Sequence, residues 1–188
     1  MIVTVSGLPG AGSTSLARDL SKVFNWKLIT MGEMFKQMAK EKGLSSGQEG
    51  SATLLLEKQK KNKSFERFHR EFDKMQKKAA RRYKNCIING KLSAFVIKDA
   101  DVRIFLKANE RIRAKRIAKR EGVSYRKALR DIRRREKIER REWKRIYNVD
   151  YAADLYAYDL VMDTSYHKIK DSTDIAVIFI KAIRRSKK

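Results

Sequence analysis

The chain has 188 residues, enough to bury the core of one domain, and its 42% content of hydrophobic residues predicts a folded rather than a disordered protein. Its 46 lysines and arginines outnumber 22 acidic residues and give a net charge of +24, which predicts attraction to polyanions such as nucleic acid. Cys86 is the single cysteine, which excludes a disulfide framework and a cysteine-built metal site. Because the sequence holds no run of about 18 apolar residues that could span a membrane, we expect a cytoplasmic protein.

The predicted elements alternate between strand and helix along the chain. A β-branched run at residues 2–5 predicts a first strand, a glycine-rich loop follows, and residues 15–24 have the pattern of an amphipathic helix. The last helix is expected at residues 172–183, with Ser172 as its N-cap. Further strands are expected at residues 26–30, 85–88, 102–106 and 160–162. Strands separated by helical stretches predict an α/β fold, with a parallel sheet covered by helices on both faces.

The loop after the first strand reads GLPGAGSTS, from Gly7 to Ser15. It matches the phosphate-binding pattern GxxxxGK followed by Ser or Thr at every position but one, because Ser13 stands where the pattern has lysine. Serine is too short to reach a γ-phosphate and carries no positive charge. The loop therefore predicts a phosphate cradle that has kept its shape and lost a cation.

Two long basic segments carry the excess charge. Residues 58–84 hold 12 basic and 3 acidic residues, residues 111–145 hold 17 and 5, and residues 184–188 form a basic tail. Both long segments lack proline and are rich in Lys, Arg and Glu, which predicts helices, the second interrupted at residues 122–124. One interpretation is a solvated helix face with ion pairs four residues apart. Since five acids cannot neutralise seventeen bases, we favour the other interpretation, binding to RNA phosphates.

The side chains expected to contact RNA share a positive charge and a place on these two segments. They are Lys60, Lys61, Lys77, Lys78, Arg81, Arg82, Arg113, Lys115, Arg116, Lys119, Arg126, Lys127, Arg130, Arg133, Arg134, Arg140, Arg141, Lys144 and Arg145.

Several segments together resemble archaeal cytidylate kinases, collinearly over nearly the whole chain. They are the phosphate loop, LITMGEMFKQMAKEKGLS (28–45), FDKMQKKAA (72–80), INGKLSAFVIKDADVRIFLKA (88–108), RIAKREGVSYRKAL (116–129) and YDLVMDTS (158–165). The resemblance implies the P-loop nucleoside monophosphate kinase fold. It divides the chain into a core (1–31, 85–110 and 146–183), a helical monophosphate-binding insertion (32–84), a basic lid (111–145) and the tail (184–188).

The resemblance also implies roles for individual residues. Backbone amides of the loop and of the following helix would hold ATP phosphates, and the Thr14 hydroxyl would hold Mg²⁺. ATP with Mg²⁺ is thus the only cofactor expected. The residues carried over for nucleotide phosphates are Gly7, Gly10, Gly12, Ser13, Thr14 and Ser15; for the monophosphate, Lys36, Asp73, Gln76 and Lys91; and for catalysis by the lid, Arg120 and Arg135.

Four residues depart from the family pattern. Ser13 replaces the loop lysine, Asn89-Gly90-Lys91 replaces an acidic residue followed by glycine and arginine, and Lys36 replaces a monophosphate-site arginine. An amide in place of a carboxylate loses charge, and lysine loses the planar fork with which arginine grips phosphate. All four substitutions fall on positions that would meet phosphate or metal.

Two hypotheses follow. The first, which the sequence favours, is a degenerate kinase that has become a non-catalytic RNA-binding protein, associated with ribosomal RNA and neighbouring ribosomal proteins through its basic segments. The alternative is an active enzyme that transfers the γ-phosphoryl group of ATP to CMP or dCMP, with lid arginines replacing the missing lysine.

Overall fold

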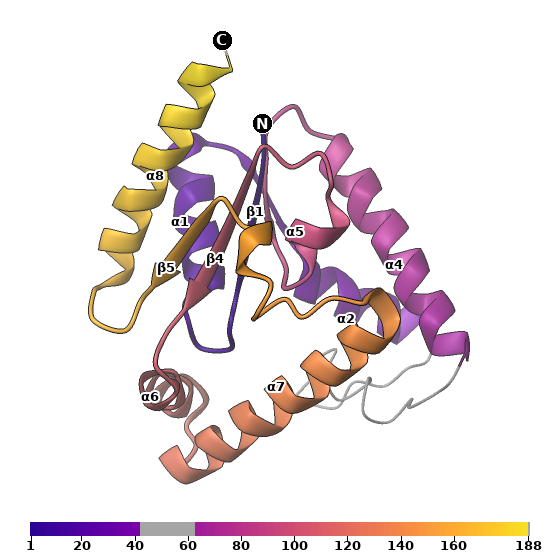
Figure 1. Cartoon of the computed structure of the whole chain (residues 1–188), viewed down its shortest axis with the longest axis vertical. Coiled ribbons are helices and arrows are strands. Elements are labelled where there is room, and N and C mark those ends of the chain that lie inside the picture. The colour runs from indigo at the N-terminus through magenta and orange to yellow at the C-terminus, as the bar shows by residue number, and fades with distance from the viewer. Residues whose placement is uncertain (42–62, 188) are drawn as a thin grey trace.

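A five-stranded parallel sheet forms the centre of the protein, as seen in a computed structural model that describes residues 1–41 and 63–187 (Figure 1). The strands are β1 (Ile2–Gly7), β2 (Lys27–Thr30), β3 (Cys86–Asn89), β4 (Val102–Lys107) and β5 (Leu160–Asp163). Their order is β2-β3-β1-β4-β5 and every neighbouring pair is parallel, so β1 lies in the middle. The predicted parallel α/β fold is confirmed.

One face of the sheet is covered by α1 (Ser13–Phe24) and α8 (Ile169–Ser186), which lie side by side (Figure 1). Because side chains alternate along a strand, Val3 and Val5 of β1 and Ile104 of β4 point into this core. There they are completely buried against residues such as Leu20 of α1.

The opposite face is covered by α2 (Met31–Glu41), α4 (Lys63–Arg81) and the short α5 (Ser93–Val96). The alternate strand residues Ile88 and Phe105 point into this second core, together with Phe35 and Phe72 from the covering helices. The aromatic residue Trp143 also joins it from the second basic segment, so that segment is partly built into the core.

The second basic segment forms two helices, α6 (Glu110–Glu121) and α7 (Tyr125–Tyr147). The predicted interruption is confirmed, because Gly122 takes a left-handed conformation with φ of 66° and Ser124 caps α7 by accepting a hydrogen bond from the Lys127 N–H. A small third core, which includes Ile117 and Ile132, holds the two helices together. A 3₁₀ turn, η1 (Leu155–Ala157), leads on towards β5.

The prediction for the start of the last helix was wrong. Helix α8 begins at Ile169, three residues early, and its N-cap is Lys168. The Asp171 carboxylate accepts a hydrogen bond from the Lys168 N–H at 2.8 Å, which stabilises this earlier start. Ser172, the predicted N-cap, instead lies within the first turn, with its hydroxyl 2.9 Å from His167 Nε2.

Within residues 1–41 and 63–187, no helix combines the length and the apolar character that a membrane crossing requires.

The buried middle of β4 provides a test of this core. We expect Ile104→Ala to lower the free energy of unfolding by roughly 2–5 kcal/mol, because the lost methyl groups leave a cavity in a completely buried position. Ile178→Ala removes the same groups from an α8 residue that is 68% exposed, and should change stability by no more than about 0.5 kcal/mol. Denaturant unfolding measures both, and equal losses would contradict the assigned core.

Candidate functional site

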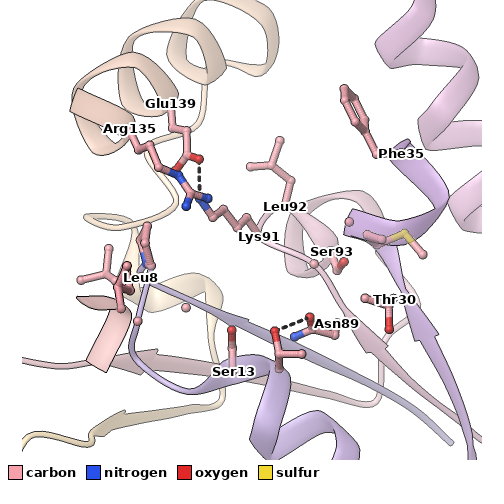
Figure 2. A pocket seen from close by; sticks show the side chains of 18 of the residues that line it. Leu8, Ser13, Thr30, Phe35, Asn89, Lys91, Leu92, Ser93, Arg135 and Glu139 are labelled. Carbon is pink, nitrogen blue, oxygen red and sulfur yellow. Dashed lines mark hydrogen bonds and ion pairs between the residues drawn. The ribbon is translucent and has the colours of Figure 1, made fainter. Parts of the chain in front are cut away.

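A cavity of about 880 Å³ lies at the edge of the sheet where the parallel strands end. Its floor is the glycine loop after β1 and the residues after β2 and β3, and its walls come from α4, α6 and α7. Figure 2 shows Ser13 and Asn89 on the floor, facing Lys91, Arg135 and Glu139. Ligands of parallel α/β proteins bind at this edge because the loops converge there.

The glycine loop turns sharply and without room for side chains. Gly10 and Gly12 have φ of 81° and 100°, values that favour glycine. A Cβ on Gly7 would lie 2.7 Å from the Leu106 carbonyl oxygen, and a Cβ on Gly10 2.9 Å from the Arg113 carbonyl oxygen. The loop therefore keeps the close backbone path that its glycines predicted.

Hydrogen bonds behind the loop fix the direction of its peptide groups. Arg113 is 4% exposed, and its Nη1 donates to the Pro9 carbonyl at 3.1 Å. Arg116 Nη1 donates to the Gly10 carbonyl at 3.5 Å, and the Thr164 hydroxyl donates to the Ala11 carbonyl at 2.8 Å. Because these carbonyls point back, the opposite side of the loop is left to its N–H groups.

Helix α1 begins at Ser13 with no side-chain cap on its first turn. The first N–H groups of a helix have no intrahelical partners and lie at the positive end of its dipole. Ser13, Thr14 and Ser15 all line the cavity. The start of α1 and the loop together therefore form a cradle that fits the phosphates of a nucleotide.

The metal-binding capacity of the cradle is modest. Thr14 Oγ1 donates to Asn89 Oδ1 at 3.4 Å, and Asn89 Nδ2 lies 3.5 Å from the Val5 carbonyl oxygen that accepts from it. Thr14 Oγ1 and Asn89 Oδ1 suit Mg²⁺ but carry no charge. The described residues contain no cluster of three His, Cys, Asp or Glu side chains that could hold a metal. The site fits a magnesium ion that arrives with nucleotide phosphates, which supply the charge.

Lys91 makes an ion pair with Glu139 of α7 inside the cavity. Burial lowers the pKa of Lys91 to about 8, although the Glu139 carboxylate opposes this shift. The Lys91 ammonium also lies 5.6 Å from the centre of the Trp143 ring, and the Tyr151 hydroxyl donates to the second oxygen of Glu139 at 3.2 Å. Lys91, predicted to hold a monophosphate, is therefore held by a carboxylate in this structure.

Asp73 and Gln76 face the cavity from α4, one helical turn apart. Burial raises the pKa of Asp73 to about 6, against a hydrogen bond from Tyr147 and the charge of Lys77. Gln76 is 3% exposed and accepts a hydrogen bond from the Ser93 hydroxyl at 2.7 Å. The two predicted residues thus offer a titratable carboxyl group and a fixed amide on one wall.

The remaining predicted site residues are placed as follows. Arg120 and Arg135 both line the cavity; Arg120 is exposed and pairs with Glu121, and the Arg135 Nε is buried with no hydrogen-bond partner among the described residues. The backbone of Lys36 belongs to α2, but its side chain lies outside what the structure describes, as do Lys60 and Lys61.

Glu139 and Tyr147 on α7 are among the cavity residues that were not predicted as site residues. Arg135 and Glu139 are four residues apart and therefore share a face of the helix. That spacing was the available signal, but nothing in the sequence shows that this face of α7 lies over β3.

Many of the basic side chains predicted to contact RNA are already paired. Their partners include acids outside the basic run itself, so counting acids within the run underestimated the neutralisation. The pairs are Arg81 with Asp99, Arg113 with Glu136, Lys127 with Asp131, Arg133 with Glu110, Arg140 with Asp150, Arg141 with Glu142, and Arg145 with Glu66 and Glu142. Exposed positions are Lys77, Lys78, Arg82, Lys115, Lys119, Arg126, Arg130, Arg134 and Lys144.

The chain is similar in sequence to proteins named cytidylate kinase. It is 41% identical over 165 residues to a cytidylate kinase of Pyrococcus abyssi, a match that covers 88% of this chain and 85% of that protein. It is 37% identical over 182 residues to a cytidylate kinase of Pyrococcus furiosus, covering 97% of this chain and 87% of that protein.

These relatives overturn the favoured hypothesis from the sequence. Proteins 34–41% identical over most of the chain carry the name cytidylate kinase, so the prediction of a non-catalytic, ribosome-associated RNA-binding protein was wrong. The prediction of ribosomal RNA and ribosomal proteins as partners was wrong for the same reason. The physical reason is that the charge excess was counted segment by segment, whereas in the folded chain Arg113 is buried and distant acids neutralise much of α7.

The fold and the sequence place the chain in the same family. A shikimate kinase from Bacteroides thetaiotaomicron superimposes with a TM-score of 0.60 at 12% identity, covering 96% of this chain and 98% of that chain, which shows a shared kinase fold. The sequence model of the cytidylate kinase-like family matches residues 2–166. With the phosphate loop, the parallel sheet and these relatives in agreement, the chain belongs to the cytidylate kinase-like family.

Proposed function

We propose that the protein is a cytidylate kinase, which transfers the γ-phosphoryl group of ATP to CMP or dCMP. The observation that carries the proposal is that one cavity joins the phosphate cradle to the wall formed by Asp73 and Gln76. Phosphoryl transfer needs two nucleotides held end to end away from water, and catalysis then depends on positioning and on charge. The curated relatives named cytidylate kinase support the choice of nucleotide.

The cradle would hold ATP. The N–H groups of the loop and of the first turn of α1 bind the phosphates, and Gly10 and Gly12 allow the backbone to approach them closely. Mg²⁺, bound with ATP beside Thr14, supplies positive charge that neutralises the phosphates. Arg113 and Arg116 hold the loop from behind and add two positive charges to its surroundings.

The opposite wall would hold CMP. Phe35 and Phe72 meet edge to face with ring centres 5.3 Å apart and provide an apolar flank for a base. The Asp73 carboxylate suits the cytosine amino group, because a carboxylate accepts hydrogen bonds from such donors. Gln76 lies beside it, and Lys36 and Lys91 are the lysines that would face the monophosphate.

The two helical segments would enclose the substrates. We assign residues 32–84 to the monophosphate-binding insertion and residues 111–145 to the lid, in which Arg120 and Arg135 approach the phosphates from above the cradle. A cytoplasmic location is part of the same proposal. The basic tail at residues 184–188 has no role in it.

A coupled assay with ATP and Mg²⁺ tests the function directly. We expect the purified protein to phosphorylate CMP and dCMP faster than UMP, which lacks the amino group that Asp73 would accept from. The relatives named cytidylate kinase favour CMP over AMP and GMP as well. Absence of transfer to every monophosphate at saturating ATP would refute the proposal.

Gly10→Ala is the matched inactive control. An added Cβ would meet the Arg113 backbone at 2.9 Å in a conformation that costs a non-glycine residue about 1–3 kcal/mol. We expect this variant to lose activity and most of the rise in melting temperature that ATP gives the unmodified protein. At Gly32 a Cβ meets nothing within 4 Å, so Gly32→Ala should keep the ATP-dependent rise.

The raised pKa of Asp73 predicts a pH dependence. The carboxyl group loses its proton near pH 6, and the charged carboxylate accepts from a cytosine amino group more strongly than the neutral acid does, so kcat/KM for CMP should fall as the pH drops through about 6. The phosphate of CMP also titrates near pH 6. Asp73→Asn separates the two effects, because it removes the titration of the side chain and leaves that of the phosphate. An unchanged pH profile in Asp73→Asn would exclude the carboxyl group from recognition of the base.

A further inference from the structure

We propose that Lys91 supplies the positive charge that Ser13 cannot, and that Glu139 holds Lys91 until the phosphates of ATP take the place of its carboxylate. The inference rests on the proposed kinase function and names the residue that replaces the missing cation. It assigns to Lys91 the stabilisation of the phosphoryl group that is transferred, in addition to the contact with the monophosphate that the resemblance implied.

The backbone of Lys91 is fixed beside the phosphate cradle. Its neighbour Gly90 donates to the Val5 carbonyl at 3.1 Å and accepts from the Ser6 hydroxyl at 2.8 Å. One residue earlier, Asn89 Oδ1 accepts from Thr14 Oγ1 in the first turn of α1. Lys91 therefore starts two residues from a contact with the loop's own helix, and its flexible four-carbon stem can swing towards the cradle.

Most other described cations near the loop have partners of their own; Arg135 is the exception, since its buried Nε has no hydrogen-bond partner among the described residues, and it lies beside Lys91 on α7. Arg113 and Arg116 donate to the carbonyls of Pro9, Gly10 and Thr164. Lys127, the other described lysine in the cavity wall, pairs with Asp131, and Arg120 is exposed beside Glu121. Among the described residues, Lys91 is the cavity lysine that follows directly on the sheet, in the turn after β3, rather than belonging to α6 or α7.

The ion pair with Glu139 stabilises the charged form of this partly buried lysine before a nucleotide binds. A buried ammonium group without a partner is strongly unfavourable, and a carboxylate with good hydrogen bonds offsets that cost. Glu139 is 1% exposed and keeps a second contact, the Tyr151 hydroxyl, when Lys91 leaves. Triphosphate oxygens carry more negative charge than one carboxylate, so they attract Lys91 away from Glu139.

Arg135 also favours the exchange of Lys91 from Glu139 to the phosphates of ATP. It lies beside Lys91 and Glu139 in Figure 2, and its positive charge disfavours the charged form of Lys91. Glu139 pairs with Lys91 beside this arginine, and the charge of Glu136, which pairs with Arg113, favours the charged form of Lys91 as well. Incoming phosphates would bring more negative charge to the same two cations.

A double-mutant cycle between positions 13 and 91 tests the inference. The proteins compared are the unmodified chain, Lys91→Met, Ser13→Lys and the double variant, with Lys98→Met as the matched control on an exposed lysine away from the cavity. We expect Lys91→Met to lower kcat on the order of 10²-fold, as for loss of one charge aimed at the transition state. Ser13→Lys should then restore at least about 10-fold in the Lys91→Met background and change the unmodified protein much less.

Two outcomes would overturn the inference while the proposed function stands. One is a Lys91→Met protein with unchanged kcat and a raised KM for CMP alone, the signature of a purely monophosphate contact. The other is a double variant no faster than Lys91→Met. If Lys91→Met fails to fold because Glu139 is left unpaired, the same cycle in the Glu139→Gln background decides the question.

Calorimetric titration with ATP and Mg²⁺ separates the inference from the proposed function. If no variant transfers phosphate, the kinase proposal fails, but the inference still requires Lys91 to contribute to the affinity for ATP. In that case Lys91→Met should weaken ATP binding at least about 10-fold and Ser13→Lys should restore it. Equal ATP affinity in the unmodified and Lys91→Met proteins would then refute the role of Lys91.

Discussion

The direction in which the peptide groups of one short loop point is the constraint on which the site depends. The carbonyls of Pro9, Gly10 and Ala11 are each engaged from behind, by Arg113, Arg116 and Thr164 respectively. A buried carbonyl without a partner is costly, so these three contacts both stabilise the loop and turn its N–H groups to the cavity. Phosphate binding at this edge of the sheet therefore depends on contacts with residues up to 153 positions away along the chain, in α6 and after β5.

The positively charged side chains of this protein occupy three kinds of position: buried, facing the cavity, and exposed in ion pairs. Arg113 is buried under the loop, and Lys91 and Arg135 face the cavity. Others, such as Arg133 and Arg140, form exposed ion pairs with Glu110 and Asp150. Exposed pairs of this kind contribute only about 0–1 kcal/mol each, so their main effect is to lower the net charge of α7. A charge count along the sequence cannot distinguish these three kinds of position.

Much of the fold could be predicted from the sequence, because its signals are local. The strand positions followed from short β-branched runs, and the break before α7 followed from Gly122, which can adopt the left-handed conformation. The cradle followed from Gly10 and Gly12 for the same reason. Each of these depends on residues within a few positions of one another.

The rest of the site could not be predicted because it depends on tertiary contacts. Glu139 and Tyr147 reach the cavity only because Trp143 is inserted in the core, and Arg113 resembled any other basic residue of its segment until the fold placed it under Pro9. The start of α8 was misplaced for a smaller reason, since Asp171 caps it from inside the helix rather than Ser172 from its end.

Helix α7 is anchored unevenly, and this sets how it can move. Ile138 and Trp143 belong to the core beneath the sheet, whereas Ala128 and Ile132 pack only against α6 in the small separate core. At 1.5 Å per residue its far end at Tyr125 lies roughly 20 Å from Ile138, so this distal half depends on α6 for its position. Because Arg113 and Arg116 tie α6 to the phosphate loop, a displacement of the loop would be transmitted through α6 to the distal half of α7.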